Sequence, residues 1–119
     1  MSFRLRQSLA VSAVSIAVLS LAGTPAFPAD EDKELQAQQE RGHTIVTKNC
    51  APCHAVDRTG TSPRPEAPLF RYLGRRYPVE SLEEALGEGI ISGHPDMPEF
   101  IFTGEDVGAI IAYLKLIQE

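Results

Sequence analysis

The chain has 119 residues, of which 43% are hydrophobic and 23% are charged, and its formal net charge is −5. This length fits one small domain, and the composition is that of a globular protein rather than a disordered or collagen-like one. The acidic balance argues against a nucleic-acid-binding protein, which would carry a basic face, and two cysteines are too few for a disulfide-dense scaffold.

The first 26 residues have the three-part pattern of a secretory signal peptide. Two arginines supply a positive start, residues 9–22 form an apolar run, and residues 24–26 place small side chains at the cleavage-determining positions. The apolar run is shorter than the roughly 20 residues that a membrane span needs. We therefore expect cleavage after Ala26, with cleavage after Ala22 and an uncleaved membrane anchor as the alternatives.

Removal of residues 1–26 would take away two arginines and no acidic residue, so the net charge would change from −5 to −7. The remaining domain, residues 27–119, would have too small a core to be more than marginally stable by itself. Domains of this size often rely on a metal, a cofactor or disulfides. We therefore expect a signal peptide followed by a single cofactor-dependent domain.

The first helix of this domain is expected over residues 32–49, which begin with a run of strong helix formers. The acidic, proline-containing residues 27–33 before it are expected to be mobile. Gly42 costs about 1 kcal/mol relative to alanine inside a helix, so we expect it to permit a close helix crossing. His43 falls on the polar side and is expected to be solvated.

The segment over residues 55–78 fits no periodic pattern, because it holds four prolines and two glycines. It also carries several large apolar side chains, which must pack on something. Long loops without regular structure are uncommon in a compact domain unless they serve a function. A bound cofactor is the surface on which we expect this loop to pack.

Two more helices are expected after this loop. Residues 81–84 have the capping-box pattern, which predicts a short helix that begins at Ser81 and is ended by the glycines beyond it. The last helix is expected to begin between Thr103 and Asp106, with acidic residues at its positive end. Its apolar stripe is formed by Val107, Ile110, Ile111, Leu114 and Ile117 and is extended by Tyr113. No segment alternates with period two, so the predicted fold class is all-α with long loops.

Residues 50–54 read C-A-P-C-H, the C-x-x-C-H pattern of c-type haem attachment. The spacing fits the chemistry, because Cys50 and Cys53 can each form a thioether with one vinyl group of the same haem. The imidazole of His54 then follows at once and can bind the iron. The secretory signal and the preceding helix favour this interpretation.

The motif has three other interpretations. A thioredoxin-type redox pair needs a βαβ context, which the sequence lacks. A zinc site needs four ligands, and only His43 and His94 remain to complete one. A structural disulfide between the two cysteines is compatible with an oxidising compartment.

A haem iron has a second axial position, which Met or His fills or which stays open for a gas. Met97 is the only methionine after residue 26, and it lies in a loop between two prolines rather than on a helix face. We therefore expect Met97 to bind the iron rather than to fill the core. His94 is the alternative ligand, and its binding would lower the reduction potential.

Together these features resemble class I cytochromes c, the small monohaem electron carriers of bacteria, over nearly the whole of residues 27–119. The resemblance rests on Gly42 eight residues before Cys50, the motif Cys50 to His54, Ala67-Pro68-Leu69, Met97-Pro98, and residues 111–115.

The resemblance implies a cytochrome c-like fold of three to five helices, with long loops around one covalently attached haem c. The first and last helices would cross near Gly42 and Tyr113. The carbonyl of Pro68 would accept a hydrogen bond from His54, and Arg75 or the adjacent arginine would lie near a haem propionate. The cofactor-binding residues are then Cys50, Cys53, His54, Pro68, Arg75 and Met97, with His54 and Met97 as the iron ligands.

The implied function is one-electron transfer in the periplasm by Fe(III)/Fe(II) cycling, and not enzymatic turnover. The partners would be periplasmic redox proteins, a dehydrogenase donor and an oxidase or reductase acceptor, with basic docking patches that fit the acidic surface. Nucleic acid is not expected as a partner, and association with a membrane is expected only if the N-terminal segment stays uncleaved. The alternatives are a haem c subunit held in a periplasmic dehydrogenase or oxidase complex, and a gas sensor with an open iron site.

Overall fold

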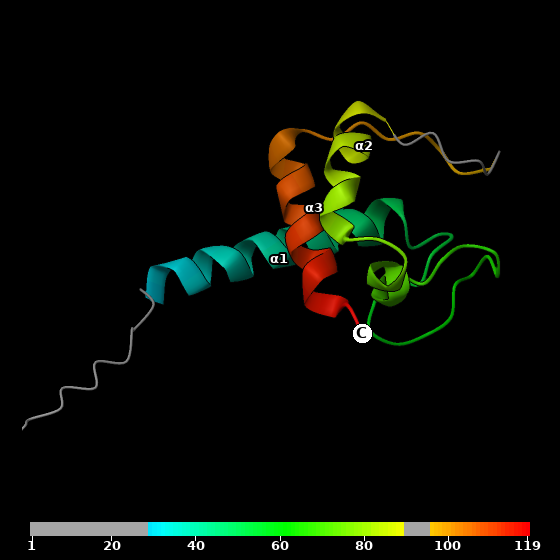
Figure 1. The fold of residues 1–119 in the computed structure, drawn as a ribbon, viewed down its shortest axis with the longest axis horizontal. Coiled ribbons are helices and arrows are strands. Elements are labelled where there is room, and N and C mark those ends of the chain that lie inside the picture. The colour runs from blue at the N-terminus through cyan, green and yellow to red at the C-terminus, as the bar shows by residue number, and fades with distance from the viewer. Residues whose placement is uncertain (1–28, 90–95) are drawn as a thin grey trace, which may run out of the picture.

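The computed structural model describes residues 29–89 and 96–119 (Figure 1). The helical elements in chain order are α1 (Ala29–Asn49), η1 (Phe70–Arg75), η2 (Val79–Leu82), α2 (Glu83–Glu88) and α3 (Gly104–Ile117), where η denotes a 3₁₀ helix. This part of the chain contains no strand, as the all-α prediction requires. The expected signal peptide over 1–26 and the alternative ligand His94 lie outside the described residues. Among the helices that are described, none is both long and apolar enough to cross a bilayer.

Helix α1 begins earlier than the sequence pattern predicted. Residues 29–33 are helical, so the expectation of a mobile lead-in over these residues was wrong. The first turn holds Asp30, Glu31 and Asp32, and carboxylates at this end interact favourably with the helix dipole. The acidic character that suggested a loop therefore stabilises the start of the helix.

Helices α1 and α3 cross at Gly42, with their backbones in contact (Figure 1). A Cβ atom on Gly42 would lie 2.0 Å from the carbonyl oxygen of Ala109 and 2.8 Å from Cβ of Tyr113. The crossing near Gly42 and Tyr113 that the resemblance implied is therefore confirmed. One turn further along α1, Val46 is buried against the same core.

Helix α3 supplies most of the core. Every residue of its predicted stripe is buried: Val107, Ile110, Ile111, Leu114, Ile117 and Tyr113. Thr103 is the N-cap, and its hydroxyl accepts a hydrogen bond of 3.2 Å from the backbone N–H of Asp106. Arg41 of α1 also donates to the carboxylate of Asp106, which lowers the pKa of that group. The predicted start of the last helix is thus confirmed.

The predicted capping box at Ser81 was wrong. Ser81 lies inside η2, where its N–H donates to the carbonyl of Pro78 at 3.0 Å. Helix α2 begins at Glu83, and no side chain caps it. The proline starts a 3₁₀ turn, which delays the α-helix by two residues. The helix ends before Gly89, whose φ of +106° favours glycine.

The long loop after the C-x-x-C-H motif was expected to lack regular structure, but residues 70–75 form the 3₁₀ helix η1. Contacts from the end of the chain hold it. The side-chain oxygen of Gln118 accepts the N–H of Gly74 at 2.7 Å, and its amide nitrogen donates to the carbonyl of Phe70 at 3.1 Å. The N–H of Phe70 also donates to the backbone carbonyl of Ala55 at 3.0 Å, so the loop folds back onto the end of the motif.

His43, which was expected to be solvated, is indeed 47% exposed and also has two partners. Its Nε2 lies 2.9 Å from Oδ1 of Asp57, and its ring centroid is 4.8 Å from that of Tyr113. The hydroxyl of Tyr113 lies 3.0 Å from the carbonyl of Val56 and 3.1 Å from the same Asp57 oxygen. These three side chains connect α1, α3 and the segment that follows the motif.

The Tyr113 hydroxyl is expected to make the fold sensitive to alkali. Burial, with the hydrogen bond to Asp57, raises the pKa of Tyr113 from 10.0 to about 12. Between these values the unfolded chain has lost the phenolic proton and the native protein retains it. The free energy of unfolding should therefore fall as the pH rises through this range.

The variant Tyr113→Phe should show a smaller fall in the free energy of unfolding at alkaline pH. At neutral pH the variant should be less stable by about 1–2 kcal/mol, because the Val56 carbonyl loses its donor. Urea unfolding of both proteins at neutral pH and at about pH 11 measures the effect. If the free energy of unfolding fell equally in both proteins at alkaline pH, Tyr113 would not be the cause of the fall.

Candidate functional site

The C-x-x-C-H motif winds directly off the end of α1. The N–H groups of Cys50 and Ala51 donate to the carbonyl of Val46 at 2.8 and 3.1 Å. The N–H groups of Cys53 and His54 then donate to the carbonyl of Cys50 at 3.1 and 2.9 Å. These tight turns place both sulfur atoms and the imidazole in the lining of one cavity of about 490 Å³.

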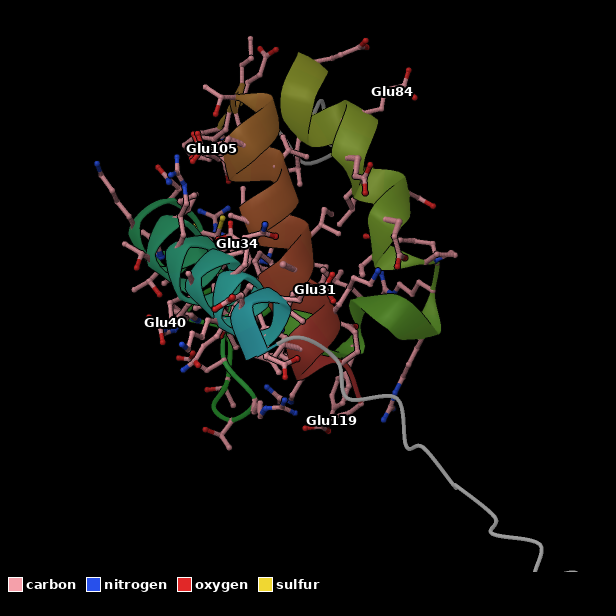
Figure 2. The ribbon with its side chains drawn as sticks, turned by 90° about the vertical axis from the view of Figure 1, so that its left-hand side faces the viewer. Glu31, Glu34, Glu40, Glu84, Glu105 and Glu119 are labelled. Atoms are coloured by element: carbon pink, nitrogen blue, oxygen red, sulfur yellow. The ribbon has the colours of Figure 1, made fainter. Side chains whose placement is uncertain are left out.

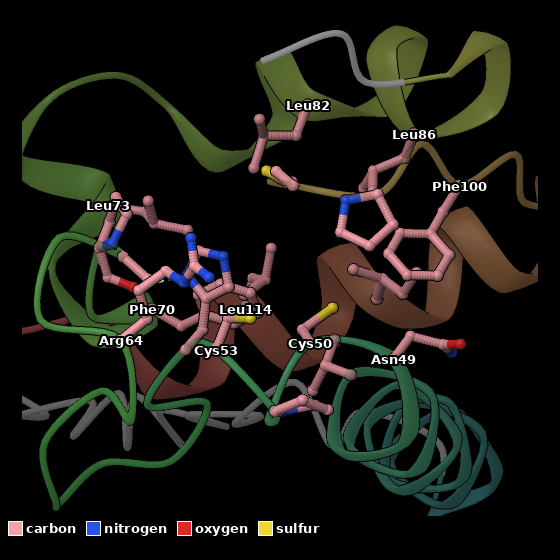
Figure 3. Close-up of a pocket in the computed structure, with 18 of the residues that line it drawn as sticks. Asn49, Cys50, Cys53, Arg64, Phe70, Leu73, Leu82, Leu86, Phe100 and Leu114 are labelled. Carbon is pink, nitrogen blue, oxygen red and sulfur yellow. Dashed lines mark hydrogen bonds between the residues drawn. The ribbon is translucent and has the colours of Figure 1, made fainter. Parts of the chain in front are cut away.

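The two cysteines both line this cavity, with Cys50 directly after the end of α1 and Cys53 on the turn that follows (Figure 3). They are not joined to each other. Burial raises the pKa of the Cys50 thiol to about 11. A thiol-based redox pair needs an accessible thiolate, so this environment does not suit a thioredoxin-type exchange reaction. In the part of the chain that the structure describes, no group of three or more His, Cys, Asp or Glu side chains is arranged to hold a metal ion.

The imidazole of His54 is oriented by the loop over residues 55–68. Its Nδ1 lies 2.9 Å from the carbonyl oxygen of Pro68. A carbonyl can only accept, so Nδ1 carries the proton and donates it. This leaves the lone pair on Nε2, the arrangement in which a histidine can bind a metal. The ring of Phe70, 4.9 Å away between centroids, packs against the imidazole.

Met97 lines the same cavity, from the segment that joins α2 to α3. Most of the remaining wall is apolar. Its residues come from the five helical elements and from the segment before α3: Val46, Phe70, Leu73, Leu82, Leu86, Phe100, Phe102, Ile110 and Leu114. Several of these side chains converge on the cavity in Figure 3. Cofactor pockets are of this size and are mainly apolar with a few placed polar groups.

The donor set of the cavity fits a haem. Two thiols three positions apart, an imidazole and the thioether of Met97 all belong to the cavity lining. The large apolar surface suits a flat macrocycle, and the buried Cys50 sulfur suits a covalent bond more than a free thiolate. The residues present therefore match the cofactor that the motif predicted.

Two arginines of this region differ in whether they line the cavity. Arg75 does not line the cavity: its Nε donates to the backbone carbonyl of Glu119 at 3.3 Å, and its guanidinium lies 4.2 Å from the centre of the Tyr72 ring. Arg64 does line it, and its Nη1 lies 2.6 Å from Oδ2 of Asp96. Sequence reasoning missed Arg64, because a polar residue in a proline-rich loop carries no local signal of the cavity that it reaches.

Comparison with known proteins gives one result. The family described as cytochrome c oxidase, cbb3-type, subunit III matches residues 37–114, which is more than half of the chain. The matched stretch contains the C-x-x-C-H motif, the Gly42 crossing and Met97. No curated protein and no solved structure matches the chain.

Proposed function

The chain belongs to the cytochrome c oxidase, cbb3-type, subunit III family, and on this premise we propose that it carries single electrons between periplasmic proteins on a haem iron bound by His54 and Met97. A cytochrome c domain holds its haem covalently, and Cys50 and Cys53 have the spacing for the two thioether bonds. When bound, the haem supplies a reversible Fe(III)/Fe(II) couple. The observation that supports the ligation is the presence of all four side chains in the lining of one cavity.

The chain's own residues hold and tune this site. The Pro68 carbonyl keeps the proton of His54 on Nδ1, which fixes the ring and makes Nε2 a better ligand. A Met ligand raises the reduction potential. The apolar lining keeps water away from the iron, and the same side chains serve both oxidation states. Little rearrangement should then accompany electron transfer.

The charge of the surface supports a partner with a basic docking patch. Carboxylates from all three α-helices are spread over the face shown in Figure 2, where Glu31, Glu34 and Glu40 follow α1 and Glu84 and Glu105 lie on α2 and α3. Such a surface attracts a basic partner at long range, so association should slow as salt rises. Binding should be transient and the interface small.

We propose no substrate turnover by the chain itself. Three carboxylates of α3 and the segment before it have structural partners: Glu105 and Asp106 bind Arg41, and Asp96 binds Arg64. Arg75, whose guanidinium lies over the Tyr72 ring, stays a candidate for contact with a haem propionate, and Arg64 lines the cavity.

Spectroscopy of the purified protein tests the proposal. A pyridine haemochrome assay should give one haem c per chain, and the oxidised protein should show the far-red band of a sulfur–iron bond. The reduced protein should not bind carbon monoxide. A colourless protein would overturn the electron-transfer role, whereas carbon monoxide binding without the far-red band would favour an open iron site.

A second candidate is a haem c subunit held in an oxidase complex, which the family match favours. Size exclusion of a native extract separates the two. Elution of the haem protein near the mass of one chain, which is 13.0 kDa with the expected signal peptide and less without it, supports a free carrier. Co-elution with a large oxidase at high salt supports the subunit.

A further inference from the structure

An ion pair at the mouth of the haem cavity joins two segments that lie far apart in the sequence. Arg64 comes from the loop after the C-x-x-C-H motif and Asp96 from the segment before α3. Nη1 of Arg64 lies 2.6 Å from Oδ2 of Asp96, and the side chains are 38% and 61% exposed. Both residues line the cavity. The pair therefore bridges two walls of the haem site where it meets solvent.

The backbone of Arg64 is itself attached to the haem motif. Its N–H donates to the carbonyl of Cys53 at 3.2 Å, and its own carbonyl accepts from Ala67 at 3.0 Å. The hydroxyl of Ser62 accepts the N–H of Ala55 at 3.0 Å, which holds the same loop. The guanidinium thus projects from a segment that is fixed relative to the attachment cysteines.

Asp96 directly precedes Met97, so whatever restrains Asp96 also restrains the methionine. A ligand held near its binding position loses less conformational entropy when it binds. The pair links the segment that anchors the haem to the segment that carries the sulfur ligand.

We propose that Arg64 is a positioning residue for Met97, and that its ion pair with Asp96 holds the thioether at the iron against displacement by external ligands. The inference rests on the proposed ligation by Met97. Arg64 acts through Asp96 and not by contact with the iron.

Exposed ion pairs contribute little to global stability, so the effect should be local. Loss of the pair should increase the population in which Met97 has left the iron by up to about fivefold, the upper end of what such pairs supply. Salt should weaken the pair in the wild-type protein by screening. Global unfolding should change little.

The test is titration of the oxidised holoprotein with imidazole, followed by loss of the far-red sulfur–iron band. Arg64→Ala and Asp96→Ala should each bind imidazole more tightly, Arg64→Ala by up to about fivefold, and the double variant should gain no more than Asp96→Ala alone. Arg64→Lys should restore most of the wild-type value, because one N···O contact carries the pair. Added salt should tighten imidazole binding to the wild-type protein and not to the variants.

Matched controls remove the same charges elsewhere. Lys48 and Glu99 are exposed and do not line the cavity, so Lys48→Ala and Glu99→Ala should leave imidazole binding unchanged. The positioning role would be overturned if Arg64→Ala and Asp96→Ala both bound imidazole with wild-type affinity, or if their effects added in the double variant. In either case, the far-red band in the wild-type protein would still support ligation by Met97. Absence of the band from the wild-type protein would overturn both.

Discussion

Gly42→Ala is expected to destabilise the protein by about 3 kcal/mol, the upper range for overpacking a core. The added Cβ would lie 2.0 Å from the carbonyl oxygen and 2.6 Å from the carbonyl carbon of Ala109. These are backbone atoms of α3, which cannot turn aside as a side chain can. The two helices must then separate, and the buried contacts of Val46 and Tyr113 loosen with them.

Thermal or urea unfolding of the holoprotein measures this effect. For a domain of this size, about 3 kcal/mol corresponds to a fall in Tm of roughly 12–24 °C. Gly108→Ala is the matched control, because Gly108 also lies within a helix but its added Cβ would meet nothing within 4 Å. That variant should gain up to about 1 kcal/mol from helix propensity. Equal stabilities of the two variants would show that the helices do not cross at Gly42.

Met97→Ala is expected to abolish the far-red sulfur–iron band and to open the iron to carbon monoxide in the reduced protein. Met97→His should instead keep the iron six-coordinate and lower the reduction potential by a few tenths of a volt, within the range of about 0.8 V that axial ligands span. The physical reason is that a thioether favours Fe(II) more than an imidazole does. Optical spectra and a potentiometric titration measure both effects.

His94→Ala separates the two possible ligands, because His94 is the other residue of this loop that could bind iron. It should leave the band and the potential unchanged. The opposite pattern, a band that survives in Met97→Ala and a potential that moves in His94→Ala, would assign the sixth position to another residue. The pyridine haemochrome assay controls for haem content in every variant.

The sequence-based predictions were correct where a feature depends on neighbouring residues, and they failed where it depends on residues that are distant in the sequence. Thr103 caps α3 and the apolar stripe of that helix is buried, because capping and amphipathicity depend on residues within a turn or two. The capping box at Ser81 has the right residues, but Pro78 starts a 3₁₀ turn there. Helix η1 was not predicted, because it is stabilised by hydrogen bonds from the side chain of Gln118, which is more than forty residues away in the sequence.

The sequence by itself determined the chemistry of the molecule. Attachment of one haem c needs two thiols and an imidazole at fixed short spacing, and residues 50–54 contain that spacing in the chain itself. The glycine at position 42 likewise predicted a close helix crossing, because a residue without a Cβ atom lets two helix backbones approach each other.

Only the tertiary structure decided which side chains surround that chemistry. It placed Arg64 rather than Arg75 in the cavity lining, paired Arg64 with Asp96, and joined His43 to Asp57 and Tyr113. A long polar side chain in a loop can reach in many directions at similar local energy. Its position is set by how distant segments pack together, and that information does not reside in the neighbouring residues.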